Sequence, residues 1–493
     1  MGVPVAARME PPLSASLPSS VSSAAPRERR GLHDIAFGLF LVLLVWAPLP
    51  LGSNRPWSWS LLIAGIALVG LVLALHLLLR GERLRLPWPV GLAGLAFAGV
   101  AGWAYLQMQP LPAAEWVNPD WVHPAWGALE PFGIEPLGGR GFGGGQAIGA
   151  VSLDVDLTRD ALMRFLGYVG AFLIAFVLAR DPEAALRLLL VVFWTATAVS
   201  AYGLFMVFGG ADLVLLMEKT AYRGVVTGTF VNRNSFATYA NLAIAIGVVW
   251  LFEPFLRDLG KREIRVLLRE LLEGLLAKRG LVLVALLVLA SASLLTASRG
   301  GFLSLAATLL TLIVLVFLLT RPRPLALAIA TPLVGGAIWG LVALSGGAVL
   351  ERFEQGSDIR LEMWAVTAEM IEDRYWVGHG YGTYEPAFYA YRDERFPLVV
   401  DKAHNTYLEH ATELGVPATV LLYASALLLF YACARGVFQR RRNKIFPLVA
   451  VAASVLVAVH AVFDFSLQIP AIAVTYAAIM GVGCAQSMRS ERK

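Results

Sequence analysis

Cysteine and charged residues are scarce in this sequence of 493 residues. The two cysteines, Cys433 and Cys484, are too few for a disulfide framework or a thiolate metal site, and we expect them to pack as small hydrophobic residues. Charged residues make up only 15% of the chain, against 58% hydrophobic residues, and the mean hydropathy is +0.67. A water-soluble domain does not tolerate such a surface, so most of the chain must face lipid.

Long apolar runs recur along most of the sequence. A helix of about 20 apolar residues crosses a hydrocarbon core of about 30 Å, whereas a closed barrel would show short alternating strands. We therefore predict an all-α polytopic membrane protein with about twelve transmembrane helices and both termini on one side. The predicted spans are residues 34–52, 57–79, 87–108, 161–179, 186–208, 236–252, 281–297, 301–320, 325–345, 414–434, 446–466 and 470–487.

The basic residues orient these spans. Of the 40 Lys and Arg residues, 26 lie in the two tails and in the loops at 80–85, 180–187, 257–279, 321–323 and 435–444. Basic loops mark the cytoplasmic side of a membrane protein, so both termini are predicted to be cytoplasmic. The net charge of +5 follows from this topology, and we expect no binding to nucleic acid.

Two cytoplasmic segments differ from the spans. Residues 1–33 are rich in Ala, Pro and Ser and predict a disordered tail before residues 34–345, which hold spans one to nine. Residues 256–279 place leucines at helical spacing apart from the basic residues, which predicts an amphipathic helix on the inner leaflet in contact with membrane lipids.

Two long loops are predicted on the outer face. The loop at 109–160 contains tryptophans, prolines and a glycine-rich stretch that lacks the ending of a phosphate-binding P-loop. The loop at 346–413, between spans nine and ten, is rich in charged and aromatic residues, and its length predicts a lid or a catalytic element. Residues 414–493 follow with spans ten to twelve and the C-terminal tail.

Four arginines are expected on the outer face, against the charge bias: Arg223, Arg233, Arg299 and Arg360. Arg299 lies in the short turn TASRGGF between two spans, where the two following glycines allow close approach of a ligand. A single arginine in such a place also fits snorkelling to lipid headgroups. Four together favour a diphosphate site, because guanidinium groups bind two oxygens at once and stabilise a leaving diphosphate without a metal.

The segment KAHNTYLEHATELGVPA at 402–418 places His404 just before a span, with Asn405 beside it and Glu413 nine residues further on. An imidazole accepts a hydroxyl proton near neutral pH, so His404 is the candidate general base. His410, six residues later, does not share the helical face of His404, and we expect it to be structural.

Two further titratable residues have open interpretations. His379 stands among glycines in VGHGYGTY, so its loop either presents the ring to a ligand or holds it structurally. Asp464 lies in the apolar run HAVFDFSLQIP near the outer end of span eleven, one turn after His460, and reads as a functional carboxylate or as half of a structural His–Asp pair. The sequence lacks a close metal-ligand pattern such as HExxH, so no metal or other cofactor is expected.

Four segments together resemble the O-antigen ligase and polymerase superfamily, often called Wzy-C. They are GTFVNRNSFATY at 228–239, TASRGGF at 296–302, RLEMWAVTAEMIEDRYWVGHGYGTY at 360–384 and AHNTYLEHATELGVP at 403–417, and their order covers roughly the second half of the chain. The resemblance implies a helical bundle of the GT-C glycosyltransferase type. It also implies a bacterial inner-membrane location, a periplasmic active site and undecaprenyl-diphosphate-linked glycans as donors, with loop 346–413 as the periplasmic catalytic loop.

The resemblance also assigns roles to single residues. It makes His404 the catalytic base and Arg299 and Arg360 the arginines that bind the donor diphosphate, with Arg233 and Arg223 as further candidates. It also matches Asn405 to the histidine motif and His379 to a second loop histidine, and we expect both to position the substrates. Beyond the resemblance, we expect the same role for Tyr381, Asn232, Glu413 and Asp464.

The expected reaction is a metal-independent, inverting glycan transfer. Ligation to the lipid A–core acceptor is the first expectation, and O-antigen or exopolysaccharide polymerisation onto a growing chain is the second. Gly415 meets the ligase motif, but Ala418 replaces the Gly, Thr or Tyr that the motif has three positions later, which favours a polymerase.

Two other functions remain as alternatives. A protein O-oligosaccharyltransferase would use the same donor and differ only in its acceptor. A transporter is favoured by twelve spans that the basic segment at 253–280 divides six and six. The spans hold almost no polar residues beyond His76, His460 and Asp464, which argues against a transport site at the bilayer midplane.

Overall fold

The computed structural model of the chain describes residues 31–110, 150–253, 279–320, 358–396, 400–440 and 442–488, together with Arg269 and Glu273. Several predicted segments lie wholly or mostly outside the described residues. They are the N-terminal tail, outer loop 109–160, the amphipathic helix at 256–279, the span at 325–345 and the first part of loop 346–413.

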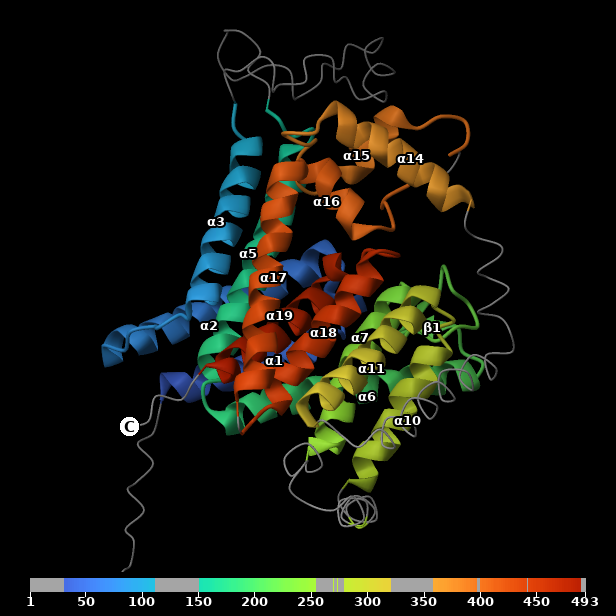
Figure 1. Ribbon diagram of the computed structural model, residues 1–493. Coiled ribbons are helices and arrows are strands. Elements are labelled where there is room, and N and C mark those ends of the chain that lie inside the picture. Colours follow the sequence, from blue (N-terminus) through green and yellow to red (C-terminus); the bar gives the residue numbers. More distant parts are fainter. Residues whose placement is uncertain are drawn as a thin grey trace, which may run out of the picture.

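The described residues form α-helices joined by short connections (Figure 1). In chain order the helices are α1 (Leu32–Trp46), α2 (Pro56–Arg80), α3 (Trp88–Gln107), α5 (Val155–Leu178), α6 (Pro182–Phe208), α7 (Arg233–Leu251), α10 (Gly280–Leu294), α11 (Arg299–Thr320), α14 (Asp358–Asp373), α15 (Tyr384–Tyr391), α16 (Thr406–Leu414), α17 (Val416–Gln439), α18 (Ile445–Ala461) and α19 (Pro470–Ser487). Short 3-10 helices cover Leu51–Ser53 and Ser466–Gln468, and an antiparallel hairpin pairs β1 (Leu213–Val214) with β2 (Met217–Glu218).

Eight of the described helices are long and apolar enough to cross a membrane: α2, α3, α5, α6, α7, α11, α17 and α19. Three more, α1, α10 and α18, are apolar but shorter. Each of these eleven helices overlaps one of the predicted spans, and the remaining prediction, 325–345, falls outside the described residues. The structure is therefore that of a polytopic helical membrane protein.

Local chemistry fixes where several helices begin. Asp154 caps α5 by accepting a hydrogen bond from the amide of Leu157 at 2.9 Å, so this helix begins six residues before the predicted span. Asp181 caps α6 in the same way, from the amide of Ala184 at 3.2 Å. Proline occupies the first turn of α2, α3, α6, α17 and α19, where its missing N–H costs nothing.

Two predicted span ends were wrong. The first span, predicted to reach residue 52, ends at Trp46 because prolines follow at 48 and 50 and the chain turns into the short 3-10 helix. The eleventh, predicted to reach residue 466, ends at Ala461, and an irregular connection carries the chain to α19. Asp464 therefore lies in a connection between two helices instead of inside a span.

The bundle packs around α7, α18 and α19, in which most residues are buried. α19 packs against α5 and α18, α18 packs against α11 and α7, and α17 packs against α3 (Figure 1). One continuous apolar core joins these helices. The connection between α18 and α19 thus lies at the end of the most buried part of the bundle.

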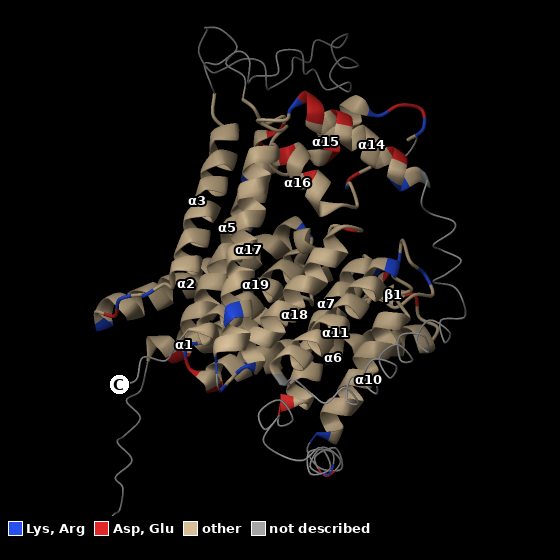
Figure 2. Cartoon of the chain, viewed as in Figure 1, with Lys and Arg blue, Asp and Glu red and all other residues tan. Residues whose placement is uncertain are grey.

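α14, α15 and α16 form a separate helical layer at one end of the bundle (Figure 1). They share a small core of their own, with Met363, Met370, Tyr384 and Phe388 among its buried residues. Figure 2 shows that carboxylates gather on this layer, whereas the spanning helices carry few charges. We call residues 358–414 the loop layer.

Hydrogen bonds from the end of α3 attach the loop layer to the bundle. The Gln107 side-chain amide donates to the backbone carbonyls of Val377 and Glu413 at 2.8 and 2.9 Å. The Trp103 indole donates to the carbonyl of Leu414 at 2.8 Å. Gln107 is fully buried, so these bonds are protected from solvent and fix the layer over the bundle.

Candidate active site

His404 occupies a constrained backbone position just before α16. Its φ of 49° is in the left-handed region, which residues other than glycine seldom adopt. The next residue, Asn405, caps α16, because its side-chain oxygen accepts from the amides of Tyr407 and Leu408 at 3.0 and 3.2 Å. The tight turn before the capped helix therefore sets the direction of the imidazole.

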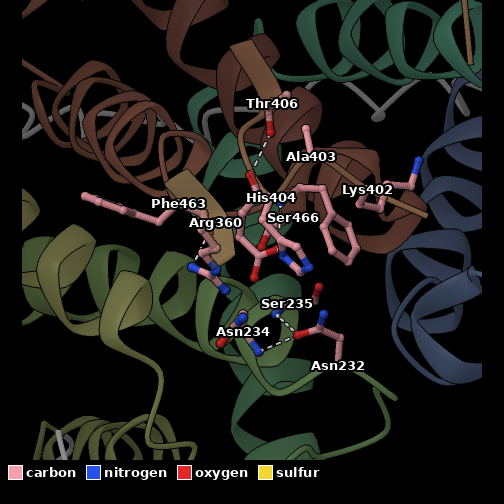
Figure 3. Close-up of polar contacts among 12 residues, drawn as sticks. Asn232, Asn234, Ser235, Arg360, Lys402, Ala403, His404, Thr406, Phe463 and Ser466 are labelled. Carbon is pink, nitrogen blue, oxygen red and sulfur yellow. Dashed lines mark hydrogen bonds and ion pairs between the residues drawn. The ribbon is translucent and has the colours of Figure 1, made fainter. Parts of the chain in front are cut away.

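The His404 imidazole pairs with Asp464, from the connection between α18 and α19. The distance from Nδ1 to the carboxylate Oδ1 is 3.2 Å, and the His404 side chain is 28% exposed while that of Asp464 is 2% exposed. The Thr406 hydroxyl donates to the Asp464 carbonyl at 2.7 Å, which ties α16 to the same connection (Figure 3). His404 thus bridges the loop layer and the membrane bundle.

The surroundings of Asp464 keep its carboxyl ionised. Burial raises its pKa, but the hydrogen bond and charge of His404, with smaller contributions from His460 and the Phe465 amide, outweigh burial and hold the pKa below its ordinary value. An ionised carboxylate only accepts hydrogen bonds, so in the neutral form of His404 the hydrogen lies on Nδ1 and the lone pair on Nε2. Nε2 is then the atom that accepts a proton.

His460 does not form the side-chain pair with Asp464 that the sequence suggested. Its carbonyl accepts from the Asp464 amide at 3.0 Å, and its Nδ1 lies 3.2 Å from the Ser466 hydroxyl. Two buried polar atoms here, Asp464 Oδ2 and His460 Nε2, have no hydrogen-bond partner among the described residues. Unsatisfied buried polar atoms are costly, and a ligand bound here would supply partners for these two.

Hydrogen bonds also fix Ala403, the residue just before His404, through both its backbone amide and its carbonyl. The buried carboxylate of Glu409 accepts from Lys402 Nζ at 3.0 Å and from the Ala403 amide at 3.1 Å. The Trp364 indole of α14 donates to the Ala403 carbonyl at 2.9 Å. We call these contacts of Trp364, Lys402 and Glu409 the Ala403 clamp; it immobilises the residue that precedes His404.

Arg360 and Arg299 approach the connection that carries Asp464. Arg360, in the first turn of α14, donates through Nη1 to the carbonyl of Phe463 at 3.3 Å (Figure 3). Arg299 begins α11, and a Cβ on the following Gly300 would lie 3.3 Å from Phe463 Cβ and 3.4 Å from His460 Nε2. The structure therefore brings these two predicted site residues to one short segment beside His404.

Arg233 reaches the same region through Tyr222. Its guanidinium carbon lies 5.2 Å from the centre of the Tyr222 ring. Burial and the charge of Asp464 raise the pKa of Tyr222, while Arg233 and Arg360 oppose that rise, so the phenol lies within electrostatic range of all three charged groups. Arg223 is exposed, and its Nε donates to the Lys219 carbonyl at 3.1 Å, at the edge of this group.

Asn232 is placed below His404 in Figure 3, at the start of α7. Its side-chain oxygen accepts from the amides of Asn234 and Ser235 at 2.7 and 3.4 Å, so it caps the helix. This cap orients the first turn of α7, which carries Arg233.

His379 is packed inside the loop layer and is only 2% exposed. Its Nε2 lies 3.1 Å from the carbonyl of Met370, and its ring contacts that of Tyr391. Burial lowers its pKa to about 4, so the ring is neutral at pH 7. The described contacts of His379 hold α14 and α15 together and do not include the His404–Asp464 pair.

Tyr381 and Glu413 lie together on the other side of the loop layer, where they line one cavity with His410. The Glu413 carboxylate accepts from the Tyr384 amide at 3.2 Å, and burial raises its pKa to about 8. His410 Nδ1 lies 2.8 Å from the Tyr423 hydroxyl, a structural contact of the kind expected for it.

The site contains residues that the sequence reasoning did not single out. Trp364, Lys402 and Glu409 lie inside the quoted motifs, but their role depends on contacts across the fold. Tyr222 stands beside Arg223, and only its position near Asp464 marks it. Among the described residues, no group of three His, Cys, Asp or Glu side chains is placed to hold a metal ion.

Comparison with known proteins points to one family. A family model described as O-Antigen ligase matches residues 283–423, which include Arg299, Arg360, His379 and His404. No curated protein matches the chain. The family match confirms the resemblance inferred from the sequence motifs.

Proposed function

We propose that this chain, a member of the O-antigen ligase and polymerase superfamily by its match over residues 283–423, transfers a glycan from a lipid diphosphate to an acceptor sugar hydroxyl. The family supports a membrane glycan transferase in general. The observation that carries the finer proposal is the His404–Asp464 pair at 3.2 Å, next to a segment that Arg360 contacts directly.

In the proposed reaction, Nε2 of His404 takes the proton as the acceptor O–H bond breaks. The freed oxygen pair forms a bond to the anomeric carbon on the face opposite the leaving group, so the configuration inverts. The bond from that carbon to the diphosphate oxygen breaks, and its electron pair stays on the lipid diphosphate. Asp464 holds the imidazole and stabilises its cation after the proton transfer.

Arginines would stabilise the negative charge that develops on the diphosphate. We assign this role to Arg299, Arg360 and Arg233, with Arg223 as an outer contact. A guanidinium stays charged at any relevant pH and binds two oxygens at once, so no metal is required for the leaving group. Asp464 Oδ2 and His460 Nε2, in the same region, have no hydrogen-bond partner among the described residues. The hydroxyls of a bound sugar would supply partners for both.

We propose an active site on the periplasmic side of the bacterial inner membrane, with undecaprenyl diphosphate as the donor lipid. The excess of basic residues in the opposite loops supports this orientation. Ligation to lipid A–core is the first assignment and chain polymerisation the second. Loss of the gene separates them, because smooth lipopolysaccharide disappears without a ligase and is capped with a single repeat unit without a polymerase.

The direct test is turnover on a purified lipid-linked glycan by His404→Ala and Arg299→Ala. Both variants are expected to lose at least about 100-fold in kcat, since each removes a group that acts in the transition state. Wild-type rates in either variant contradict the assignment. Loss of wild-type activity on adding a chelator contradicts the metal-free step.

A further inference from the structure

A second site lies on the other flank of His404. A cavity of about 230 Å³ opens between α3, α5, α17 and α19. Most of its wall is apolar and comes from the spanning helices, including Phe97, Phe165, Phe172, Leu422, Leu429 and Met480. Such a lining suits a hydrocarbon chain and not a free sugar.

One end of this cavity is polar, and it is formed by the loop layer and the adjoining part of α5. Tyr381, Lys402, His410, Glu413 and Arg164 all line it. The cavity is therefore amphipathic, with hydrocarbon walls inside the bundle and a polar end at the level of the catalytic layer. A membrane lipid with its headgroup at the polar end matches this division.

An unsatisfied polar atom supports a ligand in the cavity. The hydroxyl of Tyr168 is buried and has no hydrogen-bond partner among the described residues, and Tyr168 lines the cavity. Tyr168 lies one helical turn after Arg164, so the two side chains share a face of α5. An orphaned hydroxyl in an otherwise apolar wall is stabilised by a ligand that offers a polar group.

The cavity and Arg360, one of the arginines proposed to bind the diphosphate, lie on opposite flanks of the proposed base. Lys402, two residues before His404, lines the cavity, whereas Arg360 contacts Phe463, just before Asp464. Figure 3 shows Arg360 and Lys402 on opposite sides of His404. Gln468, on the far side of the same connection, lines the cavity as well. A base between two flanks can receive a different substrate from each.

The charges at the polar end do not suit a diphosphate. Lys402 is paired with the buried carboxylate of Glu409 at 3.0 Å, and burial raises the pKa of Glu413 to about 8, so this carboxyl is neutral at pH 7. Among Lys402, Glu409, Glu413 and Arg164, the charge of Arg164 alone is then not balanced by a carboxylate. A headgroup of sugars with low charge fits this end better than the doubly charged group proposed to bind the arginines.

We propose that this cavity binds the hydrocarbon chain of a membrane-anchored acceptor glycolipid, whose sugar reaches His404 from the flank opposite the arginines. The proposal rests on the proposed glycan transfer and names the substrate class of its second site. An acyl chain and a polyprenyl chain share the chemistry that the walls recognise. KM measurements with acylated and polyprenyl-linked acceptors separate these two sources.

Filling the cavity tests the proposal with a matched pair of variants. Ala426 lines the cavity, whereas Ala424 on the same helix is exposed on another face. Ala426→Phe is expected to raise the KM for an acylated acceptor glycolipid roughly tenfold, since it removes the space for several methylene groups. Ala424→Phe is expected to leave this KM unchanged.

The same two variants are then measured with a deacylated, water-soluble form of the acceptor and with a polyprenyl-linked acceptor. Unchanged turnover of Ala426→Phe on the deacylated form supports a site for the chain. A KM that rises only for the acyl acceptor identifies acyl chains, and one that rises only for the polyprenyl acceptor identifies polyprenyl chains. Equal losses on lipid and deacylated acceptors, or a raised KM for the donor alone, overturn the proposal.

Two controls keep this result separate from the glycan-transfer proposal and from misfolding. His404→Ala is measured beside the cavity variants; if it stays active, the proposed chemistry fails whatever the cavity variants do. Tyr168→Phe removes only the orphaned hydroxyl, so it is expected to keep or raise thermal stability while the acceptor KM rises severalfold. An unchanged acceptor KM in both Tyr168→Phe and Ala426→Phe overturns the cavity assignment.

Discussion

Nδ1 of His404 lies 3.2 Å from a carboxylate oxygen of Asp464, although 60 residues separate them in the sequence. His404 belongs to the loop layer, and Asp464 belongs to the connection between two buried helices of the bundle. Their pairing makes the geometry of the proposed base depend on how the layer sits on the membrane domain.

Asp464→Asn is expected to lower kcat at least about 100-fold while the protein stays folded. The amide keeps the shape of the carboxylate but no longer holds the imidazole in the tautomer that leaves Nε2 free, nor stabilises its cation. The measurement is kcat on a lipid-linked donor, together with circular dichroism. A variant with normal kcat means that His404 needs no carboxylate partner.

Arg360→Ala is expected to lower kcat/KM for the donor about 100-fold, because it removes a charged donor next to the developing diphosphate charge. Arg360→Lys is expected to recover only part of this loss, since an ammonium group cannot make the paired contacts of a guanidinium. Arg395→Ala is the matched control, because Arg395 lies exposed in the same layer and pairs with Asp393. Equal losses in Arg360→Ala and the control contradict a specific donor contact.

Glu409→Ala is expected to destabilise the protein by roughly 3 kcal/mol, because it leaves the Lys402 ammonium without its buried partner. It also frees the Ala403 amide and so loosens the Ala403 clamp. Thermal unfolding in detergent measures the first effect, and kcat measures the second. Asp393→Ala, which breaks an exposed ion pair, is expected to leave the melting temperature nearly unchanged.

Glu413 predicts a pH dependence of stability. Its pKa is about 8 in the folded protein, against 4.5 for an ordinary glutamate, so between these values the folded state holds a proton that the unfolded chain has released. The contribution of Glu413 to stability therefore falls as pH rises from about 4.5 to about 8. Below pH 6.5 the lowered pKa of His379 acts in the opposite direction, so melting temperatures are compared between about pH 6.5 and 8, where they are expected to fall more in the wild type than in Glu413→Gln. Glu385→Gln, at an exposed position of the same layer, should follow the wild type.

The sequence predicted eleven spans that overlap described apolar helices, because a hydrocarbon core demands long apolar helices and little else competes with that requirement. It also singled out His404, Arg299 and Arg360 as candidates, since charged and titratable residues stand out in so apolar a chain, and their roles stay a prediction. The span ends were harder to predict. At α18 the apolar run continues past Ala461, so composition alone could not reveal the irregular connection that carries Asp464.

The partners of these residues could not be predicted from spacing. Asp464 has His460 one turn away in sequence, yet its carboxylate meets His404 across the fold. The glycines around His379 left open whether its ring faces a ligand or is structural, and the core of the loop layer encloses it. Glu409 and Trp364 gain their role only because α14 and α16 pack together around the Ala403 peptide. Such contacts depend on tertiary packing, which local patterns do not encode.

The left-handed backbone at His404 determines which inactive variant is suited to forming a stable complex with both substrates. An alanine there loses the imidazole and also adopts this conformation less readily than histidine does, so the turn and the cap of α16 relax together with the loss of chemistry. Asparagine adopts the left-handed region more readily than most residues. His404→Asn therefore removes the base and keeps the turn, which makes it the substrate-trapping variant for a ternary complex with donor and acceptor.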